Sequence, residues 1–261
     1  MDTNSLTLTK ISFTLTFTRD TCLPPFFGNT IRGALGQSLY DNYRNVYDAV
    51  FKVAECESIP NPFTIGAAFP SQGDYCAGET LVFDVTLFGS ACGYDHEIVQ
   101  AAQKIGKGKL SSATLTEAEC EYSCSWSDSG AETIPSCDIL TLDFVTPTEI
   151  LISKQPTYEP SFATFIDSLF GRIAGVIDNY SDGTFMLPYS LVARKPHICA
   201  EYDLTRININ SNGHPISGFT GRIKYSGDVT RYLPYIDLGS QLHIGKKTTR
   251  SCGEYRFTVH Q

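Results

Sequence analysis

The sequence lacks the long apolar run that a membrane-spanning helix needs. No window of the 261 residues approaches the roughly 20 consecutive apolar residues that such a helix requires. Residues 1–10 also lack a basic segment followed by an apolar run, so no cleaved signal peptide is expected. Apolar residues still make up 42% of the chain, which is enough for hydrophobic cores and argues against disorder. These features predict a soluble, intracellular protein.

The nine cysteines form no CxxC pair, and their number is odd. Without an export signal, this pattern favours reduced thiols over a disulfide framework. A zinc site at Cys120, Cys124 and Cys137 would need a fourth ligand, and no histidine lies between residues 97 and 196. We therefore expect neither a metal ion nor a cofactor.

The net charge of −8 conceals a segregation of charge along the chain. Residues 51–150 hold 4 Lys/Arg and 15 Asp/Glu, whereas residues 206–261 hold 8 Lys/Arg and 3 Asp/Glu. The field near a surface is set by local patches, because salt screens charges beyond about 8 Å. The basic carboxy-terminal quarter is therefore able to meet a polyanion while the acidic part keeps the chain in solution.

Hydrophobic periodicity predicts the same order of elements twice: strand, helix, strands, helix, strand. The expected strands are 6–17, 81–89, 139–147, 201–209, 219–225 and 255–259, and the expected helices follow Asn29, span 94–105 and 159–178, and follow Asp228. Asn29 and Asp228 are the expected N-caps of their helices. This order is typical of the ferredoxin-like fold. We predict an α+β protein with tandem ferredoxin-like (RRM-like) domains at 1–137 and 138–261, joined near a polar stretch at 127–136.

The segment 239–255, GSQLHIGKKTTRSCGEY, packs a histidine and three cations between glycines. It differs from a nucleotide-binding P-loop, because five residues instead of four separate Gly239 from Gly245 and a second lysine follows Lys246. Glycines let backbone N–H groups turn outward and approach phosphate closely, while lysine and arginine supply charge. The pattern fits either a phosphate-binding loop or an ordinary solvated hairpin.

Four stretches together resemble one protein family. They are GFTGRIKYSGDVTRYLPYIDLGSQLHIGKKTTRSCGEYRF at 218–257, PPFFGNTIRGALGQSLY at 24–40, and the LVFDVTLFG and LDFVTPTEI segments. In their order along the chain they resemble the CRISPR-associated endoribonucleases that process precursor crRNA, the Cas-six type of the RAMP superfamily. The resemblance covers most of the chain.

The resemblance implies a prokaryotic cytoplasmic protein that binds CRISPR repeat RNA. It implies cleavage of precursor crRNA without metal to leave a 2′,3′-cyclic phosphate, and possible association of the protein with subunits of a CRISPR effector complex. Such a reaction needs a base for the 2′-hydroxyl proton, an acid for the 5′-oxygen and a cation for the phosphorane.

The catalytic candidates are set by a departure from the family. Many members carry a histidine in or just after the first helix, but this chain has none before His96. Tyr43 occupies that neighbourhood and is a candidate for proton transfer, with Arg32 or Arg44 as charge stabiliser. His243, near the basic segment, is the other candidate for proton transfer.

The expected RNA-binding residues combine a strand with the glycine-bearing segment. They are Arg222, Lys224, Gly245, Lys246, Lys247, Arg250 and Gly253. Arg222 and Lys224 alternate and so share one face of their strand. Two other functions stay open. One is a non-cleaving RAMP subunit that holds crRNA in an effector complex, which the missing histidine favours. The other is a small-molecule enzyme, for which no cofactor motif is present.

Overall fold

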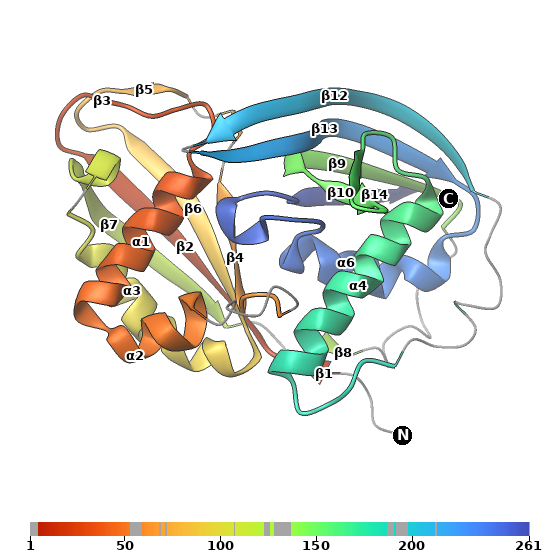
Figure 1. Ribbon diagram of the computed structural model, residues 1–261, viewed down its shortest axis with the longest axis horizontal. Helices are drawn as coiled ribbons and strands as arrows, with labels where there is room; N and C mark the ends of the chain where they lie inside the picture. Colours follow the sequence, from red (N-terminus) through yellow and green to blue (C-terminus); the bar gives the residue numbers. More distant parts are fainter. Residues whose placement is uncertain are drawn as a thin grey trace. The chain divides into compact units, whose positions relative to one another are not determined.

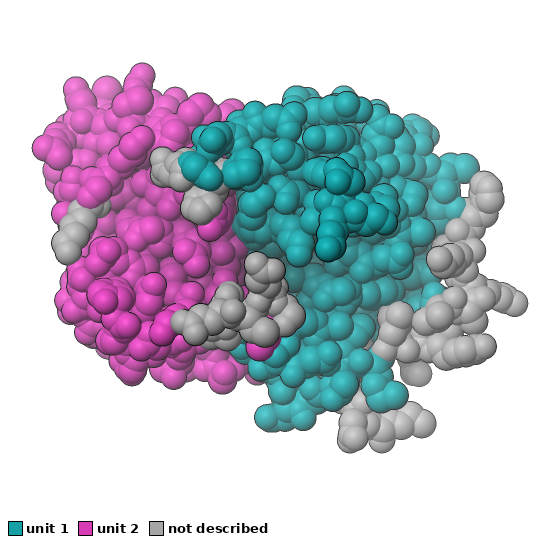
Figure 2. Space-filling model, in the orientation of Figure 1, with its two compact units in different colours: residues 1–6, 126–248, 252–261 teal, residues 7–125, 249–251 magenta. Residues whose placement is uncertain are grey.

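The computed structural model describes residues 5–52, 59–67, 69–70, 72–106, 108–122, 126–127, 137–186, 191, 198–211 and 213–260. The chain forms two compact units (Figure 2). Unit 1 comprises residues 1–6, 126–248 and 252–261, and unit 2 comprises residues 7–125 and 249–251. Each unit therefore collects residues from more than one stretch of the chain.

Unit 2 is built around a four-stranded antiparallel sheet (Figure 1). Its elements are β2 (Leu8–Phe17), β3 (Thr21–Cys22), α1 (Gly28–Asn42), α2 (Arg44–Val46), the π-helical turn η1 (Tyr47–Phe51), β4 (Phe63–Ala67), β5 (Asp74–Tyr75), β6 (Thr80–Phe88), η3 (Gly89–Tyr94), α3 (Asp95–Gln103), η4 (Gly108–Leu110) and β7 (Ala113–Tyr122). The sheet order is β4-β6-β2-β7, with β3 and β5 as a separate pair. Numbered by their order in the chain, these four strands lie 2-3-1-4, which is the split βαβ arrangement.

The core of unit 2 follows from two sequence periods. Ile11, Phe13, Leu15 and Phe17 alternate along β2 and are buried, which is the period of a strand with one face inward. On α1 the side chains of Ile31, Leu35 and Leu39 share one face and are fully buried, as predicted.

Unit 1 repeats the arrangement. Its elements are β1 (Ser5–Leu6), β8 (Trp126–Ser127), β9 (Ile139–Thr148), β10 (Ile150–Ile152), β11 (Gln155–Thr157), α4 (Phe162–Tyr180), β12 (Cys199–Ser211), β13 (His214–Ser226), η6 (Thr230–Tyr232), α6 (Leu233–Leu242) and β14 (Tyr255–His260), and η7 (Thr248–Arg250) begins at its edge. The main sheet has the order β12-β13-β9-β14 and is antiparallel throughout. Tandem ferredoxin-like topology, as predicted, is therefore confirmed.

The helices of unit 1 pack through an aromatic core. α4 buries one stripe that includes Phe165, Leu169 and Ile173, as its 3.6-residue period predicts. Ser161 caps this helix, accepting a hydrogen bond from the backbone N–H of Thr164 at 3.2 Å. Phe165 also lies against Tyr255 of β14, with ring centroids 5.8 Å apart.

Two predicted N-caps are wrong. α1 begins one residue before Asn29, at Gly28, and its N-cap residue is Phe27, which has no side-chain cap bond. Asp228 accepts a hydrogen bond from the backbone N–H of Thr230 and so begins the η6 turn, with α6 starting only at residue 233. In both places the preference for polar caps locates the start of the helix only to within a few residues.

Candidate nucleic-acid interface

The glycine-bearing segment of unit 1 begins where α6 ends. The guanidinium of Arg172, on α4, donates from Nε and Nη2 to the carbonyl oxygen of Leu242 at 3.2 and 3.1 Å. A cation at a helix carboxyl terminus is favourable because the last carbonyls carry partial negative charge. Burial lowers the pKa of Arg172 to about 10, so the group is still charged at neutral pH. Arg172 thus fixes the exit of the chain from α6.

The glycines of this segment serve close internal packing. Gly245 and Gly253 have positive φ angles of 78° and 79°. A Cβ at Gly245 would collide with the carbonyl oxygen of Glu149, and one at Gly253 with the carbonyl oxygen of Ile244. Three N–H groups of the segment donate to backbone carbonyl oxygens at 2.9–3.0 Å: Ile244 to Gly253, Lys246 to Glu149, and Gly253 to Pro147. The expectation that the N–H groups of this segment face phosphate is therefore wrong for these three.

The two lysines of the segment have different surroundings. Lys247 Nζ lies 2.6 Å from Glu149 Oε2, and the side chains of this ion pair are only 26% and 11% exposed. The same carboxylate oxygen accepts a hydrogen bond from the N–H of Ser217 at 3.2 Å. Lys246 is exposed, and among the described residues its side chain forms no ion pair. The structure therefore leaves Lys246, rather than Lys247, available to a phosphate.

Arg222 and Lys224 share the open face of the sheet, because Ile223 and Tyr225, which alternate with them, are buried. Each cation lies next to a carboxylate on a neighbouring strand: Arg222 to Asp143 at 3.8 Å, and Lys224 to Glu201 at 3.3 Å. Exposed pairs of this kind are weak. They nevertheless reduce the positive charge that the sequence alone suggests for this face.

The predicted cations do not form one cluster. Lys247 and Ser217 both contact the carboxylate of Glu149. Arg222 follows Ser217 by five residues along β13, which is about 17 Å in an extended strand. Arg250 belongs to unit 2, with Thr249 and Ser251.

In unit 2 the structure brings Arg250 together with Arg32. Arg32 Nε donates to Thr249 Oγ1 at 3.3 Å, and its guanidinium carbon lies 5.5 Å from the centre of the Phe51 ring. Desolvation by burial lowers the pKa of Arg32, and the charge of Arg250 lowers it further. Two neighbouring cations that disfavour each other's charge are stabilised by an anion between them. This arginine pair, Arg32 with Arg250, is therefore suited to hold a phosphate.

Tyr43, at the carboxyl end of α1, lies in a chain of polar side chains. Its hydroxyl donates to Gln100 Oε1 at 2.7 Å and accepts a hydrogen bond from Lys104 Nζ at 2.8 Å. The Lys104 ammonium also lies 4.6 Å from the centre of the Tyr43 ring. Gln100 Nε2 lies 2.9 Å from His96 Nε2. This polar chain, His96–Gln100–Tyr43–Lys104, holds groups for proton transfer beside a cation.

Three members of the polar chain, His96, Gln100 and Lys104, are not among the candidates that the sequence gives. The sequence favours a structural role for His96, which stands beside two acids on an expected surface helix, and it does not single out Gln100 or Lys104. The spacing of His96, Gln100 and Lys104 at i, i+4 and i+8 is the signal that could have found them, because such residues line one helical face.

Tyr43 and Arg32 are not placed at one phosphate. They lie eleven residues apart along α1 and its C-cap, about 16 Å for a helix. Arg44, the alternative charge stabiliser, lies over the Tyr40 ring at 4.0 Å and pairs with Asp48 at 3.2 Å. Lys104 is therefore the cation that contacts Tyr43 directly.

His243 lies in the interior of unit 1. The residue is 5% exposed, has a φ of 55°, and places Nδ1 3.3 Å from the carbonyl oxygen of Cys252. A ring with so little exposure offers little to a bound RNA, so the structure favours a role for His243 in shaping the segment. His197, beside Arg194 and Lys195 in the sequence, lies outside the described residues, as do residues 128–136 of the expected linker.

Candidate metal clusters and membrane-spanning helices are both absent from the described residues. No cluster of three or more His, Cys, Asp or Glu side chains suited to a metal ion occurs among them. Within the same residues, no helix is both long enough and apolar enough to span a membrane.

Comparison with sequence families divides the chain into two matched regions. Residues 6–122 match a family described as an N-terminal domain. Residues 142–255 match the CRISPR-associated endoribonuclease Cas6. This region of the chain is therefore similar to the Cas6 family. No curated protein matches the sequence.

Solved Cas6 structures share the fold along the whole chain. A Cas6 product complex is 16% identical, with a TM-score of 0.69, covering 96% of this chain and 100% of that one. Cas6 of Thermus thermophilus is 16% identical, with a TM-score of 0.65, and the match covers 97% of this chain and 99% of that one. A RAMP protein that binds different RNA substrates is 11% identical, with a TM-score of 0.57, and the match covers 96% of this chain and 99% of that one. At these identities the likeness concerns the fold, which is that of Cas6 and RAMP proteins.

Proposed function

We propose that this protein binds CRISPR repeat RNA and cleaves precursor crRNA without a metal ion, leaving a 2′,3′-cyclic phosphate. The observation that carries the proposal is the Cas6 match over residues 142–255, within a tandem fold shared with Cas6 over at least 96% of the chain. Solved neighbours include a Cas6 product complex and a Cas6-RT-Cas1–Cas2 complex, in line with RNA and CRISPR proteins as partners.

The proposed chemistry uses the polar chain of unit 2. The 2′-oxygen attacks phosphorus while its proton passes to the neutral imidazole of His96. The bond from phosphorus to the 5′-oxygen breaks, and that oxygen takes the proton of the Tyr43 hydroxyl. The Lys104 ammonium, already in contact with Tyr43 Oη, stabilises the phosphorane and the resulting tyrosinate. Gln100 contacts both Tyr43 and His96 and so orients them.

The arginine pair supplies binding in this scheme. Arg32 and Arg250 hold a second phosphate of the same RNA, since the distance along α1 is too great for them to share the scissile phosphate with Tyr43. Lys246, Arg222 and Lys224 contribute longer-range attraction, and His243, Gly245 and Gly253 maintain the path of the basic segment.

The test is cleavage of the repeat RNA of the protein's own CRISPR array in the presence of EDTA, with analysis of the product ends. Specific cleavage with a cyclic phosphate supports the proposal, and a requirement for a divalent ion contradicts metal independence. Tyr43→Phe, His96→Ala and Lys104→Ala should each lower the cleavage rate by roughly 10²–10⁴-fold with RNA binding retained. Tyr40→Phe, His260→Ala and Lys109→Ala, which alter exposed residues outside the polar chain, are the matched controls.

A second function is favoured by one observation. No histidine precedes His96 in the sequence, and Tyr43 stands at the end of the first helix instead. A RAMP subunit that holds crRNA in an effector complex without cleaving it would bind the same repeat RNA tightly and yield no product. The cleavage assay separates the two functions directly.

A further inference from the structure

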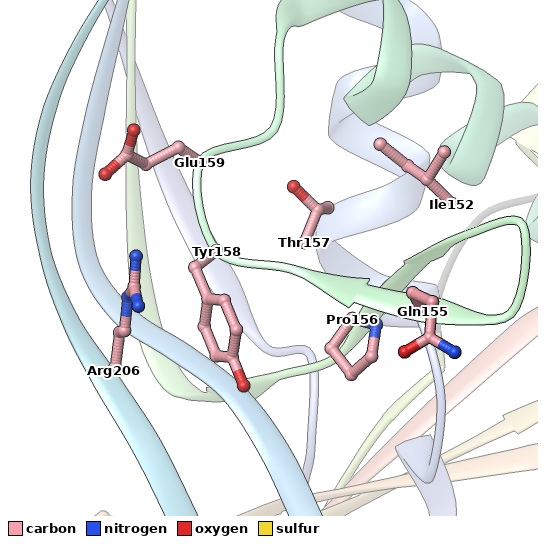
Figure 3. A pocket seen from close by; sticks show the side chains of 7 residues that line it. All are labelled: Ile152, Gln155, Pro156, Thr157, Tyr158, Glu159 and Arg206. Atoms are coloured by element: carbon pink, nitrogen blue, oxygen red, sulfur yellow. The ribbon is translucent and has the colours of Figure 1, made fainter.

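A pocket of about 380 Å³ lies in unit 1, apart from every residue assigned above to RNA binding or cleavage. It is formed between the β10–β11 hairpin with the residues that follow it and strand β12 (Figure 3). Its lining residues are Ile152, Gln155, Pro156, Thr157, Tyr158, Glu159 and Arg206. The volume is in the range of sites that hold small organic ligands or parts of larger ones.

The pocket has an aromatic ring and a guanidinium as its defining pair. The guanidinium carbon of Arg206 lies 4.7 Å from the centre of the Tyr158 ring. Arg206 is paired with Phe219 of β13, which is fully buried, so Arg206 projects from the helix-facing side of the sheet. Figure 3 shows the Glu159 carboxylate and the Arg206 guanidinium on the same side of the Tyr158 ring.

The polar side chains of the pocket are not used by the fold. Within the described part of the chain, the side chains of Glu159 and Arg206 form no hydrogen bond or ion pair, and the Arg206 guanidinium lies against the Tyr158 ring. Thus an acid, a cation and an aromatic ring line one hollow, and within the described residues no ion pair neutralises either charge.

This combination selects one class of ligand. A bare phosphate would be repelled by Glu159, and a purely apolar ligand would leave Arg206 and Glu159 desolvated without partners. A nucleotide supplies a partner for each of these groups. Its base stacks on an aromatic ring or a guanidinium plane, and its ring N–H and amino groups donate to a carboxylate. Its phosphate pairs with the arginine.

We propose that this pocket binds one unpaired nucleotide of the RNA, which makes it a recognition site for single-stranded sequence. The base stacks on the Tyr158–Arg206 pair, Glu159 accepts hydrogen bonds from its N–H groups, and Arg206 also contacts the adjoining phosphate. The proposal rests on the proposed function, because it takes repeat RNA as the ligand.

The test is a fluorescence scan of the repeat RNA. A single 2-aminopurine replaces each unpaired nucleotide in turn, and a 2′-deoxy substitution at the mapped cut site prevents cleavage. At one position, binding should change the fluorescence, and Tyr158→Leu should abolish that change while Tyr158→Phe retains it. Tyr158→Leu should weaken binding roughly 5- to 100-fold, the range for loss of one stacked base. Arg206→Gln should reduce the salt dependence by about 0.7 in the log–log slope.

Arg256→Gln is the matched control for Arg206→Gln, because Arg256 is an exposed arginine on β14 of the same unit and lies outside the pocket. Unfolding midpoints of all variants should agree. If repeat RNA binds and no position responds to Tyr158→Leu, or if Arg256→Gln has the same effect as Arg206→Gln, the pocket proposal is overturned while the proposed function stands. If the wild-type protein does not bind repeat RNA, the proposed function itself fails.

Discussion

Arg32 and Thr249 lie 217 positions apart in the sequence and are joined by a hydrogen bond of 3.3 Å from Nε to Oγ1. The bond shows how the last part of the chain contributes to unit 2. Residues 249–251 leave the basic segment of unit 1 and pack at the start of α1, where Gly28 admits their backbone. The arginine pair exists only because of this excursion.

Arg32→Gln should weaken binding of repeat RNA and lower its salt dependence by about 0.7–0.9 in the log–log slope, the share of one phosphate contact. An anion relieves the repulsion between Arg32 and Arg250, so added sulfate should also raise the unfolding midpoint of the wild type more than that of the variant. Titrations at several salt concentrations and thermal melts measure the two effects. Equal sulfate responses in both proteins would show that the pair holds no anion.

Gly28→Ala should destabilise the protein by about 1–3 kcal/mol, the usual cost of overpacking. The added Cβ would collide with the carbonyl oxygen of Arg250 and come within 2.6 Å of Ser251 Cβ. Gly33→Ala is a sharp control, because it lies one turn further along the same helix with no atom within 4 Å of its Cβ position. That change should instead stabilise the helix by about 1 kcal/mol. Urea unfolding of both variants checks the contrast.

Lys247→Ala should cost about 1–3 kcal/mol of stability, because it leaves the largely buried carboxylate of Glu149 without its cation. Lys246→Ala should change stability by less than about 0.5 kcal/mol, because this side chain is exposed. RNA affinity should respond in the opposite order, more to Lys246 than to Lys247 in folded protein. A larger loss of stability from Lys246→Ala would contradict the assignment.

Arg172→Met should destabilise unit 1 by about 2 kcal/mol, because it removes two charged hydrogen bonds to Leu242. Hydrogen exchange should rise in residues 243–253, which depend on this end of α6. Arg231→Met, at an exposed arginine in η6, is the comparison and should leave both measurements near wild type. Unchanged exchange in residues 243–253 would mean that Arg172 does not fix this segment.

Much of the fold follows from local patterns. The alternation in β2 and the apolar stripe of α4 predict their elements because each periodicity matches one buried face. β7 was missed because ATLTEAECEY, at an edge of its sheet, is polar along much of its length. Its strand character comes from pairing with β2, which no local signal reveals.

The candidate site was harder to predict for the same reason. The sequence indicates Arg32 within the first helix and Tyr43 near its end, but linear spacing does not show that Lys104 contacts Tyr43 and Thr249 contacts Arg32. The basic segment looked like a single cluster with Arg222 because charges were counted along the chain. In the fold Lys247 forms an ion pair with Glu149, which lies 98 residues away in the sequence.

The discontinuity of unit 2 bears on how the protein matures during translation. Residues 7–125 leave the ribosome first, yet the start of α1 stays uncovered until residues 249–251 have been synthesised. Nascent chains halted before that point should show α1 accessible to proteases and should carry an unfinished phosphate anchor. Unit 2 thus gains its complete arginine pair only in the last part of synthesis.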